Sequence, residues 1–259
     1  MEQKDMERVQ EIVSELAPEL KELSLKIHDN PELGNQEFKA CKWQMELLQK
    51  YGFETSDNFC DIPTAYKAVY KGDKPGPKMA MLAEYDALPE LGHGCGHSAL
   101  GAGAFGAVLA VKDYLEKTGK SGTVKLYGCP AEETGYGKTF MTRAGCFEGV
   151  DAVLTWHPFD NNAAWTFSSL ANVSVKFKFF GRTAHAAAAP QAGRSALDSC
   201  EIMNVGVNYL REHVIPEARM HYAYLDVGGT SPNVVQDHAC VHYFLRAPKS
   251  AQVQEILAR

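Results

Sequence analysis

The sequence KMAMLAEYDALPELGHGCGH, residues 78–97, runs from an apolar segment into a loop that is rich in potential metal ligands. Its first part, residues 78–83, predicts a short β-strand. The Gly/Ala-rich stretch that follows, residues 98–115, predicts a closely packed helix. A strand, a polar loop and a helix in this order are typical of an α/β sheet, in which catalytic residues lie at strand ends and in the loops after them.

The loop contains His93, Cys95 and His97, which are separated by single glycines. Residues two positions apart in an extended chain point to the same side, so Cys95 and His97 can both present a donor atom to one metal ion. A structural zinc site would need a second closely spaced Cys/His pair, and a c-type haem would need Cys-x-x-Cys-His; the sequence has neither. Taken alone, the loop is compatible with a metal site and with a structural role that binds no metal.

Strands and helices alternate through the first part of the chain. Helical periodicity covers residues 6–27 and 36–50, and β-like runs cover residues 64–70, 123–127 and 150–155. After about residue 169 the order becomes strand (173–179), helix (193–211), strand (222–227), strand (238–246) and a helix that opens at residue 250. We therefore predict an α/β domain over residues 1–170 and a smaller α+β domain over residues 171–259. The smaller domain lacks a final strand, so we interpret the chain as truncated at its C-terminus.

The composition excludes several other classes of protein. Hydrophobic residues make up 45% of the 259 residues and charged residues 22%, which is ordinary for a globular protein. The formal charge of −6 argues against a nucleic-acid partner, and no apolar run reaches the roughly 20 residues needed to span a membrane. The N-terminal residues are highly charged and contain no secretory signal, which predicts a cytoplasmic location. The seven cysteines are then expected to be reduced, mostly as small core residues.

Glu132 and Glu133 follow one predicted strand, residues 123–127, and His157 follows another, residues 150–155. Adjacent carboxylates repel each other, and a metal resolves that conflict if one carboxylate ligates while the other acts as general base on water. A solvated acidic loop is the alternative for the glutamate pair, and a buried core histidine is the alternative for His157. The expected position of these residues at the same end of one sheet as the Cys-Gly-His loop favours a metal site.

Four segments occur in the order and spacing of one known family: AEYDALP (residues 83–89), GHGCGH (92–97), PAEE (130–133) and GRTAH (181–185). The chain resembles the metallo-amidohydrolases of metallopeptidase family 20, which include aminoacylases, hippurate hydrolases and indole-acetyl-amino-acid hydrolases. The first two segments look most like the p-aminobenzoyl-glutamate hydrolase branch, in the subunit designated B. The resemblance implies a zinc-peptidase-like catalytic domain, with a central mixed sheet flanked by helices, and a ferredoxin-like lid domain that also forms dimers.

The resemblance also implies a dinuclear metal centre, in which two divalent ions lie a few ångströms apart. The ligands that it implies are Cys95, His97, Glu133 and His157. Glu132 corresponds to the general base that takes a proton from water and delivers it to the leaving amine. Asp86 corresponds to a carboxylate that orients a ligating imidazole. Zinc or manganese is expected, and cobalt or nickel also suits mixed Cys, His and Glu ligands.

Three features depart from the family pattern or lie outside its ligand set. Glu84 stands where some relatives carry a His ligand, and the Cys-Gly-His segment is expected to supply the ligand instead. His93 is expected to pack or to support a ligand rather than to bind metal. Family members also continue past the lid domain and contribute one more His ligand, which is not among these 259 residues. We therefore expect one metal to be under-coordinated in this chain.

In the lid domain, His185 corresponds to a His that polarises the scissile carbonyl, often across a dimer interface. Asn233 and Arg246 correspond to residues that bind the backbone and the carboxylate of the substrate, and a guanidinium binds a carboxylate through two hydrogen bonds. For Arg246 alone, an Arg at a strand edge without substrate contact is the alternative. The resemblance thus implies a homodimer formed through the lid domain, with a second hydrolase subunit as a further partner.

The leading hypothesis is a metal-dependent hydrolase of the amide bond in N-acyl amino acids, including N-aroyl amino acids, or dipeptides. The alternative from another class is a truncated, catalytically inactive chain of the same family that binds a ligand or a partner. A thiol hydrolase with Cys95 as nucleophile and His97 as base is chemically conceivable, but it leaves the glutamate pair and His157 unexplained.

Overall fold

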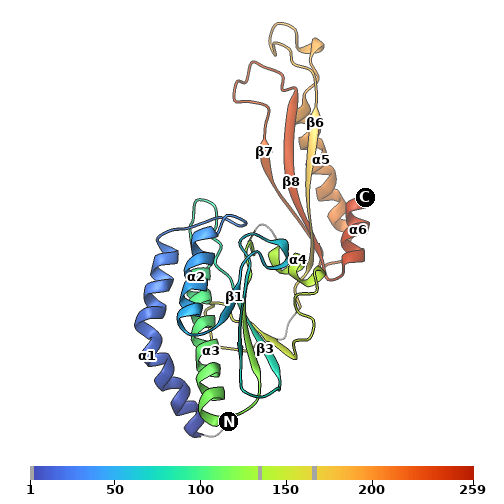
Figure 1. The fold of residues 1–259 in the computed structure, drawn as a ribbon. Helices are drawn as coiled ribbons and strands as arrows, with labels where there is room; N and C mark the ends of the chain where they lie inside the picture. Colours follow the sequence, from blue (N-terminus) through green and yellow to red (C-terminus); the bar gives the residue numbers. More distant parts are fainter. Residues whose placement is uncertain (1–2, 134–135, 165–167) are drawn as a thin grey trace. The chain divides into compact units, whose positions relative to one another are not determined.

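The computed structural model describes residues 3–133, 136–164 and 168–259 (Figure 1). The chain divides into two compact units, residues 1–162 and residues 163–259. Each unit has its own hydrophobic core and is described by itself. The assignment of the first as the catalytic domain and of the second as the lid stays a prediction. No helix within the described ranges has the length and apolar character that a membrane crossing requires.

The first unit is built on a mixed sheet of five strands in the order β1-β2-β4-β3-β5. Strand β3 runs parallel to both β4 and β5, whereas β2 is antiparallel to β1 and β4. The strands are β1 (Glu54–Ser56), β2 (Tyr66–Lys71), β3 (Lys78–Ala83), β4 (Thr123–Gly128) and β5 (Ala152–Leu154). The predicted fold class, α/β with a central mixed sheet flanked by helices, is confirmed.

Helices cover the sheet of the first unit. The long helices lie side by side on one side of the sheet (Figure 1), and they bury Ile27, Leu48 and Phe105 against the strands. They are α1 (Gln3–His28), α2 (Phe38–Lys50) and α3 (His97–Thr118). The short helix α4 (Gly137–Arg143) packs Met141 on the other face, against Leu82. Helix α3 begins at His97, so the helix that packs on the sheet also fixes a predicted metal ligand.

The sequence does not predict two features of the first unit. Strand β1 is only three residues long and lies at the edge of the sheet, where the sequence pattern carries little signal. Cys60 and Cys146 form a disulfide, whereas reduced thiols were expected. These two cysteines are 86 positions apart, and pairing at such a separation depends on the fold, which cysteine spacing alone does not reveal. The expectation of reduced thiols is therefore wrong for this pair; the other five cysteines are free.

The second unit is a three-stranded antiparallel sheet in the order β6-β8-β7, with two helices. Its elements are β6 (Ala171–Phe180), α5 (Ala196–Leu210), β7 (Arg219–Asp226), β8 (His238–Ala247) and α6 (Ser250–Ala258). The predicted order of strand, helix, strand, strand and helix is confirmed. Residues of β8 alternate between buried and half-buried positions, and Val241 and Tyr243 lie in a core that both helices cover.

Candidate metal centre

The candidate site lies at the carboxyl ends of three parallel strands of the first unit. Ala83, the last residue of β3, pairs with Gly128, the last residue of β4, and β5 pairs with β3 in the same direction. The segments that leave these strands therefore start at one edge of the sheet, as is usual for sites in α/β folds. These segments carry Glu84 and Asp86 after β3, Glu132 and Glu133 after β4, and His157 after β5.

Asp86 holds His97 in place. The Nδ1–H group of His97 donates to Asp86 Oδ1 at 2.9 Å and also approaches the Asp86 carbonyl oxygen at 3.0 Å. Asp86 Oδ2 accepts the backbone N–H of Glu133 at 2.9 Å. Burial alone would raise the pKa of Asp86, but the hydrogen bonds from His97 and Glu133 outweigh it and lower this pKa. An ionised Asp86 that binds Nδ1–H directs the other ring nitrogen, Nε2, into the site.

His97 Nε2 faces three carboxylates. The distances from this nitrogen are 3.2 Å to Glu84 Oε2, 3.9 Å to Glu132 Oε2 and 4.0 Å to Glu133 Oε1. Among the described residues, His97 Nε2, Glu84 Oε2 and Glu133 Oε1 are buried side-chain atoms without a hydrogen-bond partner. Burying such atoms unpaired is costly, and a shared cation would satisfy all of them. The residues present therefore fit a metal ion.

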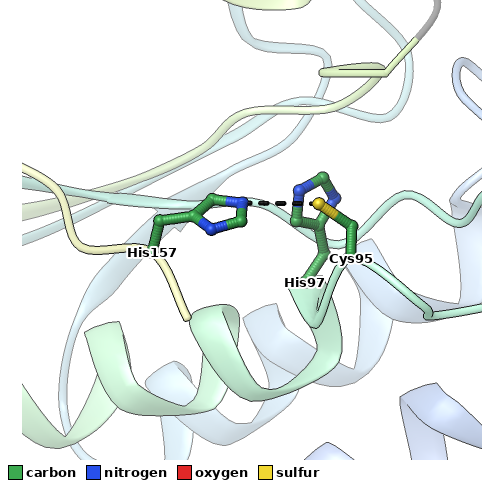
Figure 2. A group of neighbouring side chains, drawn as sticks. All are labelled: Cys95, His97 and His157. Atoms are coloured by element: carbon green, nitrogen blue, oxygen red, sulfur yellow. Dashed lines mark hydrogen bonds between the residues drawn. The ribbon is translucent and has the colours of Figure 1, made fainter. Parts of the chain in front are cut away.

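Cys95 and His157 add two further donor atoms on the same side (Figure 2). Cys95 Sγ lies 3.5 Å from His157 Nε2, and the rings of His97 and His157 meet edge to face at 5.6 Å between centroids. His157 Nδ1–H donates to the carbonyl oxygen of Pro158 at 2.9 Å, so Nε2 keeps its lone pair. The donor atoms of Cys95, His97 and His157 all lie within 4.8 Å of one another. So do those of Glu84, His97 and Glu132, and His97 belongs to both groups.

The environment of Cys95 disfavours a thiol nucleophile. Burial and the nearby carboxylates of Glu133, Glu132 and Glu84 raise the pKa of Cys95 to about 12. A reactive cysteine needs a lowered pKa, because the thiolate is the nucleophile. Cys95 also approaches His157, whereas the predicted base, His97, binds Asp86 through Nδ1. A cation at this position would reverse the effect of the carboxylates and deprotonate the thiol, as thiolate ligation requires.

Glu132 and Glu133 differ in exposure and in surroundings. The side chain of Glu132 is 39% exposed and that of Glu133 is 19% exposed, with Glu133 Oε1 fully buried. Burial and the charges of Glu84 and Glu133 raise the pKa of Glu132, although Lys138 and His97 act in the opposite direction. A more exposed carboxylate with a raised pKa suits proton transfer, whereas a buried unpartnered oxygen suits ligation.

Glu37 positions the loop that carries the two glutamates, and sequence reasoning missed it. Its buried Oε1 atom accepts the backbone N–H of Ala131 at 2.7 Å, and burial raises the pKa of Glu37. Ala131 has a positive φ of 54°, a backbone conformation that non-Gly residues rarely adopt without such support. Only the fold brings Glu37 to Ala131, which is 94 positions away, so the sequence carries no signal for this contact.

Two other contacts fix the surroundings of the ligands. Trp156 Nε1–H donates to the carbonyl oxygen of Leu100 in α3 at 3.1 Å. The ring of Trp156 lies so close to Gly103 that an added Cβ would be 2.5 Å from it, so glycine lets the segment of His157 approach the helix. His93 is buried and its ring lies 6.3 Å from that of His28, outside both groups of donor atoms.

The second unit carries the remaining predicted site residues. His185 Nδ1 accepts the N–H groups of Ala187 and Ala188, so a neutral His185 carries its proton on Nε2. The N–H of the next residue along, Ala186, donates to the Asn233 carbonyl oxygen at 2.9 Å, which brings the segments of His185 and Asn233 together. His185 and Asn233 are both exposed.

Arg246 also belongs to the second unit, but it lies on strand β8, whereas His185 and Asn233 lie in loops. It is half-buried, and its guanidinium lies over the ring of Phe244 at 5.5 Å. Its Nε atom is buried without a hydrogen-bond partner among the described residues. The substrate-binding roles predicted for Arg246 and Asn233 stay predictions.

Known proteins resemble this chain over most of its length. A model of peptidase family M20/M25/M40 matches residues 80–253. The chain is 45% identical over 250 residues to the subunit designated B of p-aminobenzoyl-glutamate hydrolase from Escherichia coli strain K12, covering 90% of this chain and 52% of the relative. It is 34% identical over 261 residues to the Xaa-Arg dipeptidase of Mus musculus, covering 95% of this chain and 59% of the relative. The chain thus spans little more than half the length of these relatives.

Solved structures share the fold. The crystal structure of an aminobenzoyl-glutamate utilization protein from Klebsiella pneumoniae superposes with a TM-score of 0.69 at 22% sequence identity. The superposition covers 96% of this chain and 72% of that protein. At this level of identity the likeness concerns the fold alone.

Proposed function

Because the chain belongs to peptidase family M20/M25/M40, we propose that it forms the metal-binding part of a hydrolase that cleaves an amide bond in N-acyl amino acids or dipeptides. The family that the sequence motifs predicted is confirmed by this match. The observation that carries the proposal is that buried atoms of His97, Glu84 and Glu133 lie close together without hydrogen-bond partners. The donor atoms of Cys95 and His157 lie beside His97. The names of two relatives, a p-aminobenzoyl-glutamate hydrolase subunit and a dipeptidase, support an amide bond next to an amino acid.

The ligands proposed for two divalent ions are Cys95, His97, Glu133 and His157, with zinc or manganese as the first candidates and cobalt or nickel compatible. When bound, such ions polarise a carbonyl group and make water more acidic. Two groups of candidate donor atoms overlap at His97, whose free nitrogen Nε2 would bind one of the two ions. Asp86 keeps the His97 ring in the orientation that turns Nε2 toward this ion.

Glu132 is proposed as the general base. Its raised pKa and partial exposure suit a carboxylate that takes a proton from water and passes it to the leaving amine. His185 is proposed to donate its Nε2–H to the oxygen of the scissile carbonyl, which agrees with the tautomer that its Nδ1 contacts impose. Asn233 and Arg246 are proposed to bind the substrate's backbone and carboxylate.

A homodimer formed through the second unit, and a second hydrolase subunit, are the proposed partners. The relative from Escherichia coli is named as one subunit of its hydrolase, which supports the second of these partners.

Replacing Asp86 with Asn is expected to lower the affinity for zinc or manganese roughly 10–100-fold, because the neutral amide no longer fixes the His97 ring. Isothermal titration with each metal measures the change. Asp113→Asn is the matched control, since Asp113 lies in the same helix as His97 but pairs with Arg8 and Lys117. Equal affinity in the Asp86 and Asp113 variants would contradict the role given to Asp86.

The proposed activity is tested by amine release from a substrate panel. Metal-reconstituted protein is incubated with N-acyl amino acids, p-aminobenzoyl-glutamate and dipeptides, and free amine is quantified with and without a chelator. Release that the chelator abolishes is the expected result. Metal-loaded protein that includes the downstream segment of the family and still releases no amine from any member of the panel would reject the hydrolase. Activity only with that segment would favour a chain that by itself binds a ligand or partner.

A further inference from the structure

We propose that Glu84 is itself a metal ligand, which binds through Oε2 the same ion as His97 Nε2. The inference rests on the proposed metal centre and extends it, because the resemblance to known enzymes gave the ligand role to the Cys-Gly-His segment and none to Glu84. The position of Glu84 directly after β3 places its side chain for metal binding. Glu84 and Asp86 leave β3 two positions apart, and they reach the two nitrogens of one imidazole: Asp86 at Nδ1 and Glu84 at Nε2.

The burial of Glu84 is the first argument. Only 5% of the residue is exposed, and its Oε2 atom is buried without a hydrogen-bond partner. His97, which it faces, is fully buried, and its Nε2 atom also has no hydrogen-bond partner. Because Nδ1–H is engaged by Asp86, a neutral His97 turns a lone pair toward a carboxylate oxygen. In this neutral form two electron-rich atoms face each other in a buried place, and a cation between them, like a proton on Nε2, removes the conflict.

The distance is the second argument. His97 Nε2 and Glu84 Oε2 are 3.2 Å apart. Two neighbouring ligand atoms on one ion are expected to lie about 3–3.5 Å apart, because metal–nitrogen and metal–oxygen bonds are about 2.0–2.2 Å long. Glu132 Oε2 lies 3.9 Å from His97 Nε2, and one donor atom each of Glu84, His97 and Glu132 lies within 4.8 Å of the others.

Lys138 supplies the third argument. Its Nζ atom donates to Glu84 Oε1 at 2.5 Å, so one oxygen of the carboxylate is held and the other remains for an ion. Lys138 lies in α4, the helix that follows Glu132 and Glu133 in the sequence. The single positive charge of Lys138 cannot neutralise Glu84, Glu132 and Glu133 together, whereas divalent ions can. The rival interpretation is that Glu84 serves only to hold Lys138.

The two interpretations predict different metal affinities for a matched pair of variants. If Glu84 is a ligand, Glu84→Gln lowers metal affinity by more than the roughly 10–100-fold loss that removal of a supporting partner causes. Lys138→Met then keeps or raises the affinity, because a cation that repels the metal is lost while Oε2 stays. If Glu84 only holds Lys138, the two variants bind metal to a similar extent. Isothermal titration with zinc and manganese separates these results.

A second variant tests direct ligation without relying on Glu84→Gln. In the cobalt-loaded protein, Glu84→Ala is expected to change the d–d absorption of the ion, because one carboxylate ligand is lost, whereas Lys138→Met keeps the spectrum of the parent. Absorption equal to that of the parent overturns the proposal. If the parent chain binds no cobalt at all, the metal centre itself is rejected; if the parent binds cobalt and the Glu84 variants behave like it, only the role of Glu84 is rejected.

Discussion

Replacing Glu132 with Gln is expected to lower the rate of amide hydrolysis by about 10²–10⁴-fold, the usual contribution of a positioned general base. The amide keeps the shape of the carboxylate but cannot take a proton from water. Because Glu132 is the more exposed of the two adjacent glutamates, and is not the proposed ligand, the metal content of the variant is expected to stay unchanged. Turnover is measured with a substrate that the parent chain cleaves, and metal content by elemental analysis of the same sample.

The neighbouring residue provides the matched control. Glu133→Gln changes the same chemical group one position along the chain, but it alters a buried oxygen that faces His97. This variant is expected to lose metal as well as activity. Loss of metal in Glu132→Gln together with full metal content in Glu133→Gln would show that the two roles are exchanged.

Replacing His97 with Ala is expected to have the largest effect on metal binding. The side chain is fully buried, and His97 is the residue that both groups of donor atoms share, so its removal takes a ligand from either group. It also removes the hydrogen-bond donor of the buried Asp86 Oδ1, and leaving a buried acceptor unpaired costs about 1–3 kcal/mol, more for a charged group. The metal-free variant is therefore expected to be less stable than the metal-free parent.

The measurement is the free energy of unfolding with and without metal. A ligand present at 100 times its dissociation constant raises the free energy of unfolding by about 2.7 kcal/mol. At such a metal concentration we expect a gain of about this size for the parent and a much smaller gain for His97→Ala. His238→Ala serves as the control, because His238 is an exposed residue of the second unit that pairs with Asp226 and Asp237. A metal-dependent gain in His97→Ala equal to that of the control would contradict the assignment.

The sequence predicts most of the fold, because the patterns that mark its strands, helices and turns involve residues that are close together in the chain. Turn-forming residues such as those of segment 72–77 separate the strands, and the strict alternation of residues 173–179 marks β6. The bounds of the elements differ by a few residues from those expected: β6 extends from Ala171 to Phe180, and α1 begins at Gln3. Strand β1 has too few residues to show a pattern, and it is defined by its pairing with β2.

The sequence likewise predicts one part of the candidate site and does not predict another. The ends of β3, β4 and β5 meet because parallel strands share a direction, so the convergence of Asp86, Glu133 and His157 on His97 follows from topology. The contacts of Glu37 with Ala131 and of Lys138 with Glu84 depend on how side chains pack across distant segments. Neither contact has a motif in the sequence. The same holds for the unpartnered oxygen of Glu84, which only the structure reveals.

The most direct test of the metal centre is a cobalt titration of the purified chain, followed by absorption spectroscopy. Cys95 is the only cysteine in either group of donor atoms found among the described residues, so a bound ion is expected to take its thiolate as a ligand. A charge-transfer absorption that saturates with bound cobalt, disappears in Cys95→Ser and remains in Cys129→Ser is the predicted result. No such absorption, or the same absorption in the Cys95 variant as in the parent, would contradict a metal centre at this site.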